Sequence, residues 1–217
     1  MDYAKARHAM VEGQLRTNRI VDPTLIAALE EIPREQFVPT KLAGIAYVDE
    51  ALPLGQGRYL MEPLAVARMI ESAQIEPGHV VLDVGCATGY SSALIARLAQ
   101  TVVALEEVAD FAREANRLFG VLGCDNAAVV EGRLVDGYKK QAPYDIIVIE
   151  GAVEDVPSAL TDQLAEGGRL VCIVAAGGGI GRGTVISKLA GTLTRQAVFD
   201  AGTPLLPSFQ RKPTFAF

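Results

Sequence analysis

The chain has 217 residues, half of them hydrophobic, and a net charge of −6 at pH 7, so it can bury a sizeable core and has no general basic surface for nucleic acid. No apolar run reaches the roughly 18 to 20 residues that a membrane span needs, and residues 1–5 lack a signal-peptide core. We therefore expect a cytoplasmic protein without nucleic-acid or membrane partners.

Helices are predicted first along the chain. One covers residues 4–16, and a second is opened by Asp22 as N-cap, with Pro23 at its first position, and is ended by Pro33. Residues 39–63 follow as an irregular stretch that is too long for an ordinary connection. We expect a functional loop or lid there.

After Pro63 the patterns of helix and strand alternate, which predicts a doubly wound, mostly parallel sheet of seven strands with helices on both faces. The last two strands have no helix between them and are predicted to pair antiparallel. We expect one domain, with helices and a lid loop in residues 1–62 and an α/β core in residues 63–217. Helices are predicted at 64–74, 91–99, 108–122 and 157–164, and strands at 80–84, 101–106, 127–131, 144–150, 169–175, 184–189 and 193–199.

The three cysteines, Cys86, Cys124 and Cys172, are far apart and lie in apolar segments. An odd number at such spacing favours reduced thiols that pack in the core over disulfides or metal ligands. We therefore expect no metal site.

The segment from residue 80 to residue 90 is the most informative part of the chain. A β-branched apolar run ends on Asp83 and breaks into a turn with Gly85 and Gly89, whose missing side chains let the backbone come close to a ligand. A second apolar run ends on Glu106, where an acid can accept hydrogen bonds from both hydroxyls of a ribose. This pattern predicts a site for a nucleoside-bearing cofactor.

The spacing of the glycines indicates which cofactor. A dinucleotide site requires G-x-G-x-x-G, which is absent, so a nicotinamide oxidoreductase is disfavoured. The sequence D-x-G-x-A-x-G, with Ala87 where a middle glycine is usual, resembles the S-adenosylmethionine corner of class I methyltransferases. We therefore expect S-adenosylmethionine, held by Asp83, Gly85, Cys86, Ala87, Gly89 and Glu106.

Five further segments follow in order: VEGQL at 11–15, IPREQFVP at 32–39, AYVDEALPLG at 46–55, APYD at 142–145 and QLAEGGRLV at 163–171. Together with the corner they resemble the protein-L-isoaspartate O-methyltransferase family, over about residues 10–175. That family repairs proteins by methylating the α-carboxylate of isoaspartyl residues with S-adenosylmethionine. The resemblance therefore implies a Rossmann-like class I methyltransferase whose substrate is a protein or peptide carboxyl.

The loop that reads Gly-Gln-Thr-Ile-Ser-Gln-Pro in the family is Gly-Arg-Tyr-Leu-Met-Glu-Pro at residues 57–63. Tyr59 and Met61 thus replace the hydroxyls that lie beside the methyl acceptor, Glu62 follows, and Glu150 replaces the family's threonine after the fourth strand. Two acids would repel an isoaspartyl carboxylate but suit a cation, an amine or a hydroxyl that must lose its proton. We take Glu150, Glu62 and Met61 as candidate catalytic residues.

The family's Gly-Asp-Gly, whose acid faces the adenine amine, is here Gly132, Arg133 and Leu134. We expect Arg133 and Leu134 at the adenine end of the pocket, with Arg133 stacked on the ring or turned to Glu131 or Glu150. Three hypotheses stay open: isoaspartyl methylation, methylation of another acceptor such as a small molecule, and a non-catalytic or regulatory protein that has kept the fold. In the last of these, Glu150 caps a helix or pairs with Arg133.

Overall fold

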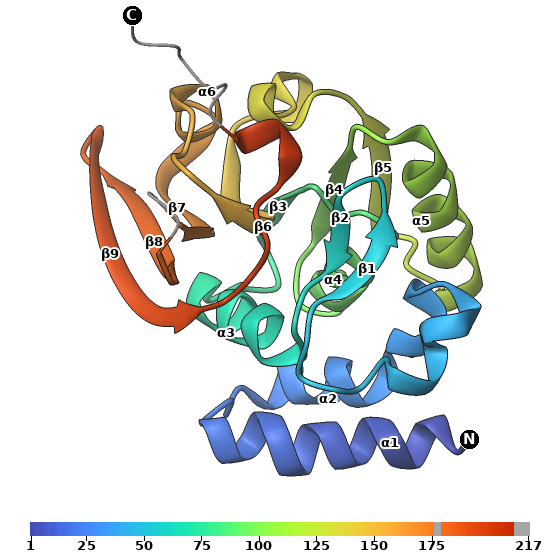
Figure 1. Ribbon diagram of the computed structural model, residues 1–217. Helices are drawn as coiled ribbons and strands as arrows, with labels where there is room; N and C mark the ends of the chain where they lie inside the picture. The colour runs from blue at the N-terminus through green and yellow to red at the C-terminus, as the bar shows by residue number, and fades with distance from the viewer. Residues whose placement is uncertain (176–178, 211–217) are drawn as a thin grey trace, which may run out of the picture.

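The computed structural model describes residues 1–175 and 179–210, and its centre is a seven-stranded sheet (Figure 1). The strands are β3 (Val80–Val84), β4 (Thr101–Glu106), β5 (Ala127–Glu131), β6 (Tyr144–Val153), β7 (Leu164–Val174), β8 (Gly181–Leu189) and β9 (Thr192–Ala201). They lie in the order β5-β4-β3-β6-β7-β8-β9, with parallel pairing from β5 to β7 and antiparallel pairing for β8 and β9. The predicted sheet, with its antiparallel closing pair, is confirmed.

Successive side chains of the central strands point to opposite faces of the sheet, and each face packs in its own hydrophobic core. Val81 lies in the core that also holds side chains of the four helices α2 (Pro23–Glu31), α3 (Pro63–Ala73), α4 (Tyr90–Ile95) and α5 (Ala109–Leu122). Its neighbour Leu82 lies in the second core, with the short helix α6 (Ser158–Thr161) and Leu206 of the C-terminal segment. Both residues are fully buried, as expected for a central strand covered on both faces.

The N-terminal helices lie together at one end of the molecule (Figure 1). Helix α1 (Tyr3–Met10) continues through further helical turns to Asn18, and Arg19, with a φ of 67°, ends it. The Asp22 carboxylate accepts hydrogen bonds from the backbone N–H groups of Thr24 and Leu25, so the predicted N-cap of α2 is present. Among the described residues, no helix is long and apolar enough to cross a membrane.

Two helices are shorter than predicted. Helix α4 ends at Ile95, and the chain continues to residue 100 in turns. Helix α6 ends at Thr161, because Leu164 already pairs with Tyr144 as the first residue of β7. Gln163, which lies between α6 and β7, accepts a hydrogen bond from the backbone N–H of Tyr144 through its backbone carbonyl.

The stretch predicted to be irregular, residues 39–63, contains a small hairpin. Strands β1 (Leu52–Gly55) and β2 (Arg58–Leu60) pair antiparallel and form a sheet of their own. The turn places Gln56 and Gly57 at φ values of 52° and 72°. Positive φ at two consecutive turn residues suits the right-handed twist of a hairpin, so the glycine at the second position is the signal that sequence reasoning missed.

We predict that Gly89→Ala destabilises the protein by about 2 kcal/mol or more. Gly89 has a φ of +93°, and a Cβ there would lie 2.7 Å from the ring of Phe119. The matched control is Gly123→Ala, since Gly123 has a φ of +64° but no atom within 4 Å of a Cβ, so it loses only about 1 kcal/mol. Urea unfolding measures both, and equal losses would show that the contact with Phe119 is unimportant.

Candidate functional site

Asp83 is the penultimate residue of β3 and is fully buried. Its Oδ2 accepts hydrogen bonds from the hydroxyls of Ser91, at 2.7 Å, and Ser92, while Oδ1 has no partner. Burial raises the pKa of Asp83 to about 6, against the lowering effect of the two serine hydroxyls. The acid at this corner is therefore tied to the start of α4, and one of its oxygens is unsatisfied.

Glu106 ends β4 and has no exposed surface. Its Oε2 accepts the backbone N–H of Ala87 at 2.7 Å. Its Oε1 accepts the N–H groups of Glu107 at 2.9 Å and Val108 at 3.0 Å, and also the Nη1 of Arg58 at 2.7 Å. The carboxylate that we expected to hold a ribose is therefore fully engaged by the chain itself.

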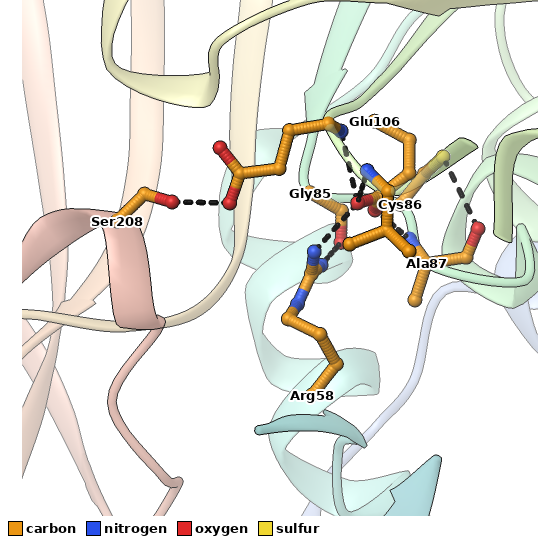
Figure 2. Close-up of polar contacts among 8 residues, drawn as sticks. Arg58, Gly85, Cys86, Ala87, Glu106 and Ser208 are labelled. Atoms are coloured by element: carbon orange, nitrogen blue, oxygen red, sulfur yellow. Dashed lines mark hydrogen bonds and ion pairs between the residues drawn. The ribbon is translucent and has the colours of Figure 1, made fainter. Parts of the chain in front are cut away.

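Arg58 of strand β2 reaches into this corner (Figure 2). Besides its ion pair with Glu106, its Nη2 donates a hydrogen bond to the backbone carbonyl of Gly85 at 2.7 Å. The Arg58 side chain is only 2% exposed. Sequence reasoning missed this contact, although Arg58 stands in the loop that departs from the family, where the family has glutamine.

The C-terminal segment closes the same corner from the other side. Leu206 donates its N–H to the carbonyl of Ala152 at 2.8 Å, which fixes the segment beside β6. A Cβ on Gly151 would lie 2.5 Å from the Leu206 side chain, and one on Gly85 would lie 3.6 Å from it. Ser208 follows, and its hydroxyl donates to the Glu107 carboxylate (Figure 2).

Glu150 lies near the middle of β6, at 8% exposure, and its Oε1 has no partner. Burial raises the pKa of Glu150 well above its usual value, and the charge of Asp83 adds to this effect while Arg34 and Arg58 oppose it. The space beside Glu150 is a cavity of about 10 Å³, which is room for one water molecule. It is lined by Tyr59, Met61, Glu150, Gly151, Thr203 and Leu206, among others.

The three candidate catalytic residues do not all line this cavity. Met61 is buried beside Glu150, as expected, and Tyr59 lies at the rim with 39% exposure. Glu62 instead accepts a hydrogen bond from the hydroxyl of Thr203 at 2.8 Å and lines a separate cavity of about 290 Å³, next to Asp49. The structure therefore groups Glu150 with Met61 and places the Glu62 carboxylate apart.

Arg133 does not turn to Glu131 or to Glu150. Its Nη1 pairs with Asp136 at 3.1 Å, and its side chain is 76% exposed. The hypothesised Arg133–Glu150 pair is wrong, because an ion pair at spacing i,i+3 leaves the guanidinium in solvent and needs no desolvation. Leu134, by contrast, is buried, and its side chain lies 3.4 Å from the position of a Cβ on Gly85.

Arg34 organises the lid and was missed as a structural residue. It is fully buried, its Nε donates to the carbonyl of Ala46 at 2.7 Å, and its Nη2 donates to the carbonyl of Met61. Its guanidinium also lies 4.9 Å from the ring centroid of Tyr90, the first residue of α4. Burial lowers the pKa of Arg34. One side chain thus joins two points of the 39–63 loop, Ala46 and Met61, to the helix that follows the glycine corner.

The expected packing role of the cysteines is confirmed, since Cys86, Cys124 and Cys172 are all buried and free. Burial raises the pKa of each of the three thiols, which makes them poor metal ligands and poor nucleophiles.

Ala87 occupies the left-handed region, with a φ of 49°. This conformation costs a residue with a Cβ about 1–2 kcal/mol, and glycine would adopt it freely. The hydrogen bond from its N–H to Glu106 holds the conformation in place. Ala87 therefore adopts the turn conformation that a glycine usually takes at this position, and its backbone is strained.

A mostly parallel seven-stranded sheet with an acid at the ends of β3 and β4 and a glycine turn after β3 defines a class I methyltransferase fold. The model of the family "Protein-L-isoaspartate(D-aspartate) O-methyltransferase (PCMT)" matches residues 5–197. The chain belongs to this family, whose members are S-adenosylmethionine-dependent methyltransferases.

Relatives span most of the chain. A protein-L-isoaspartate O-methyltransferase of Koribacter versatilis is 40% identical over 198 residues, which are 91% of this chain and 89% of that one. Another, of Methanoculleus marisnigri, is 41% identical over 170 residues, 78% of this chain and 77% of that one. A structure from Plasmodium falciparum, a putative protein-L-isoaspartate O-methyltransferase in complex with S-adenosyl-L-homocysteine, shares the fold, with a TM-score of 0.78 at 20% identity over 96% of this chain and 99% of that one.

The corner has the residue types that a nucleoside cofactor needs, but it does not accommodate one in the observed arrangement. The Glu106 carboxylate and the Gly85 carbonyl are both bonded to Arg58. Leu206 fills the space between Gly85 and Gly151. S-adenosylmethionine would therefore enter only after Arg58 and Leu206 had moved.

We predict strong energetic coupling between Arg58 and Glu106, because removing one partner of a buried ion pair leaves the other charge buried and unpaired. Each of Arg58→Gln and Glu106→Gln should cost about 3 kcal/mol of unfolding free energy, and a double-mutant cycle by urea unfolding should give a coupling above about 2 kcal/mol. The exposed pair of Arg113 and Asp110 is the control and should couple by less than about 1 kcal/mol. Similar coupling in the two pairs would contradict the prediction.

We also predict that Glu150→Gln stabilises the protein at neutral pH and not at pH 4. Because the folded pKa of Glu150 lies above the usual 4.5, the unfolded chain releases this proton first as the pH rises. The native protein therefore loses stability as the pH rises from about 4.5 towards the folded pKa, and glutamine removes this loss. Thermal unfolding of both proteins across this range tests the sign, and a difference independent of pH would refute it.

Proposed function

We propose that this methyltransferase acts on a neutral or basic acceptor, and only weakly on the isoaspartyl carboxylate. The observation that supports the proposal is the buried carboxyl group of Glu150, with its unpartnered oxygen, in the cavity next to Met61. The chain's family acts on protein substrates. The acceptor is therefore a group on a protein or peptide, or a small molecule of the same chemistry.

The environment of Glu150 argues against an anionic acceptor. From the sequence we expected the charges of Glu62 and Glu150 to repel an isoaspartyl carboxylate, but the raised pKa of Glu150 favours its protonated, uncharged form. Burial and the charge of Asp83, which raise this pKa, would act in the same way on an acceptor carboxylate placed beside it. An isoaspartyl group, with an ordinary pKa near 4, would have to lose its hydration there.

The lining of the cavity supports the same conclusion. Met61 is 2% exposed and presents a thioether where the family's loop has a hydroxyl. A thioether is a weak acceptor and no donor, so it cannot orient a carboxylate. The free Oε1 of Glu150 can accept a hydrogen bond from an amine or hydroxyl and align it, and in its ionised form Glu150 can take the proton that such an acceptor must lose.

A second candidate function is a non-catalytic protein that has kept the fold. The occupation of the cofactor corner by Arg58 and Leu206 favours it. The two candidates differ in one observable: the catalytic one turns over a methyl group, and the non-catalytic one does not.

We predict that methylation of an isoaspartyl peptide by the purified protein is at least tenfold slower than by the Koribacter versatilis relative, which is about 1.4 kcal/mol of transition-state stabilisation. Transfer of tritiated methyl groups to the peptide, and to panels of amines and alcohols, measures this. The double variant Tyr59→Thr, Met61→Ser restores the hydroxyls of the family's loop and should raise the rate on the peptide.

The matched control is Glu62→Gln, which changes the neighbouring residue of the loop but leaves the cavity beside Glu150 intact. It should not raise the rate on the peptide. Rates on the isoaspartyl peptide equal to those of the relative would refute the proposed acceptor. The absence of transfer to every acceptor, with cofactor binding retained, would favour the non-catalytic candidate.

A further inference from the structure

We propose that Arg58 is an internal competitor of the cofactor: its guanidinium occupies the polar groups of the cofactor corner, and S-adenosylmethionine binds only when the β1–β2 hairpin withdraws it. The inference rests on the proposed function for the identity of the ligand. It describes how Arg58 controls the access of S-adenosylmethionine to the corner, whichever acceptor the enzyme methylates.

The contacts of Arg58 coincide with the groups that the cofactor needs. Glu106 is the acid placed to accept the hydroxyls of a ribose, and Arg58 takes its Oε1 at 2.7 Å. Gly85 is the residue whose missing side chain leaves room for a ligand, and the Nη2 of Arg58 lies 3.1 Å from the position of its Cβ. Arg58 therefore uses both features that predicted a ligand.

Arg58 is incompletely satisfied in this corner, although two hydrogen bonds hold its guanidinium there. Its Nε is buried without a partner. Two hydrogen bonds, to the Glu106 carboxylate and to the Gly85 carbonyl, offset the desolvation of the buried guanidinium, and one of its N–H groups stays unsatisfied. A ligand that takes over Glu106 would release the arginine to solvent, where all its N–H groups are hydrated.

The segment that carries Arg58 is fixed at its ends and exposed at its tip. Arg34 bonds the carbonyls of Ala46 and Met61, so one buried side chain fixes both ends of the intervening segment. Within it, β1 and β2 pair only with each other and not with the main sheet. Each strand has a leucine buried in the first core, whereas the turn at residues 55–57 is exposed, so the tip next to Arg58 can move while the ends stay fixed.

The consequence is a lower apparent affinity for the cofactor, because only the fraction of molecules with Arg58 withdrawn can bind. Replacing Arg58 by glutamine removes the charge that pairs with Glu106 and installs the residue that the family has in this loop. We therefore expect Arg58→Gln to bind S-adenosyl-L-homocysteine at least tenfold more tightly than the native protein.

Isothermal calorimetry with S-adenosyl-L-homocysteine compares the native protein, Arg58→Gln and the matched control Arg182→Gln. Arg182 is 70% exposed on β8 and makes only a weak contact, at 3.9 Å, with Asp200. The control should bind like the native protein. If Arg58→Gln folds poorly, Arg58→Lys replaces it, since lysine keeps the charge but cannot bond Glu106 and Gly85 in the same fork-like way, and it should bind more tightly than the native protein.

A second readout follows the hairpin itself. Trypsin cleaves after arginines in accessible backbone, so S-adenosyl-L-homocysteine should accelerate cleavage after Arg58 in the native protein, while cleavage after Arg19, an exposed residue in the turn before α2, serves as the internal reference. Fragment masses identify the two cuts. Cleavage after Arg58 that the ligand leaves unchanged or slows would overturn the proposal.

The outcomes also separate this inference from the proposed function. Equal and measurable binding by the native protein and Arg58→Gln would overturn the competition but leave the methyltransferase intact. Absence of binding by both would overturn the competition and the proposed function together. Tighter binding by Arg58→Gln, with ligand-accelerated cleavage after Arg58 in the native protein, would support the proposal.

Discussion

The buried negative charge of Glu106 is the constraint on which the carboxyl edge of the sheet depends. It lies at the end of β4 without exposed surface, and a charge in that position must be paired or hydrogen-bonded. The Glu106 carboxylate accepts hydrogen bonds from backbone N–H groups of the glycine corner and of the loop after β4, and from Arg58 of the hairpin. One carboxylate thereby holds together three segments that are far apart in the sequence, and it fixes the strained backbone of Ala87 as well.

Two buried arginines, Arg34 and Arg58, bond different kinds of partner around the lid. Arg34 bonds the backbone carbonyls of Ala46 and Met61 within the lid and lies against Tyr90, so its partners are neutral groups of the framework. Arg58 bonds one charged side chain and one carbonyl in the cofactor corner. The first arginine therefore attaches the lid to the framework, and the second bonds the polar groups of the corner beneath it. The family's fold is retained, while the loop that carries Arg58 departs from the sequence that is typical of the family.

The fold could be predicted largely from the sequence, since it depends on local patterns. The β-branched runs at Val80–Val84 and Thr101–Glu106 form strands with the predicted bounds, and Asp22 caps its helix because capping needs only neighbouring backbone. The positions of Asp83 and Glu106 at strand ends followed in the same way. The hairpin was missed because three and four residues are too few for a periodic signal.

The partners of the site residues could not be predicted, because they join distant parts of the chain. Arg58 and Glu106 are separated by 48 residues, and no pattern in either segment specifies the other. Arg133 was expected to turn inward, but Asp136 is closer along the chain and lets it stay hydrated. Glu150 was interpreted from its charge alone, whereas its burial changes which protonation state the site presents.

The two acids with raised pKa values, Asp83 and Glu150, give the corner a property of its own. Each has one oxygen without a partner, and each is held towards its protonated form by burial. A cationic ligand that entered the corner would favour the ionised forms of both, so its binding would release protons to the solvent. Such a ligand would be captured more tightly in alkaline than in acidic solution, and the heat of its binding would vary with the buffer that takes up the protons.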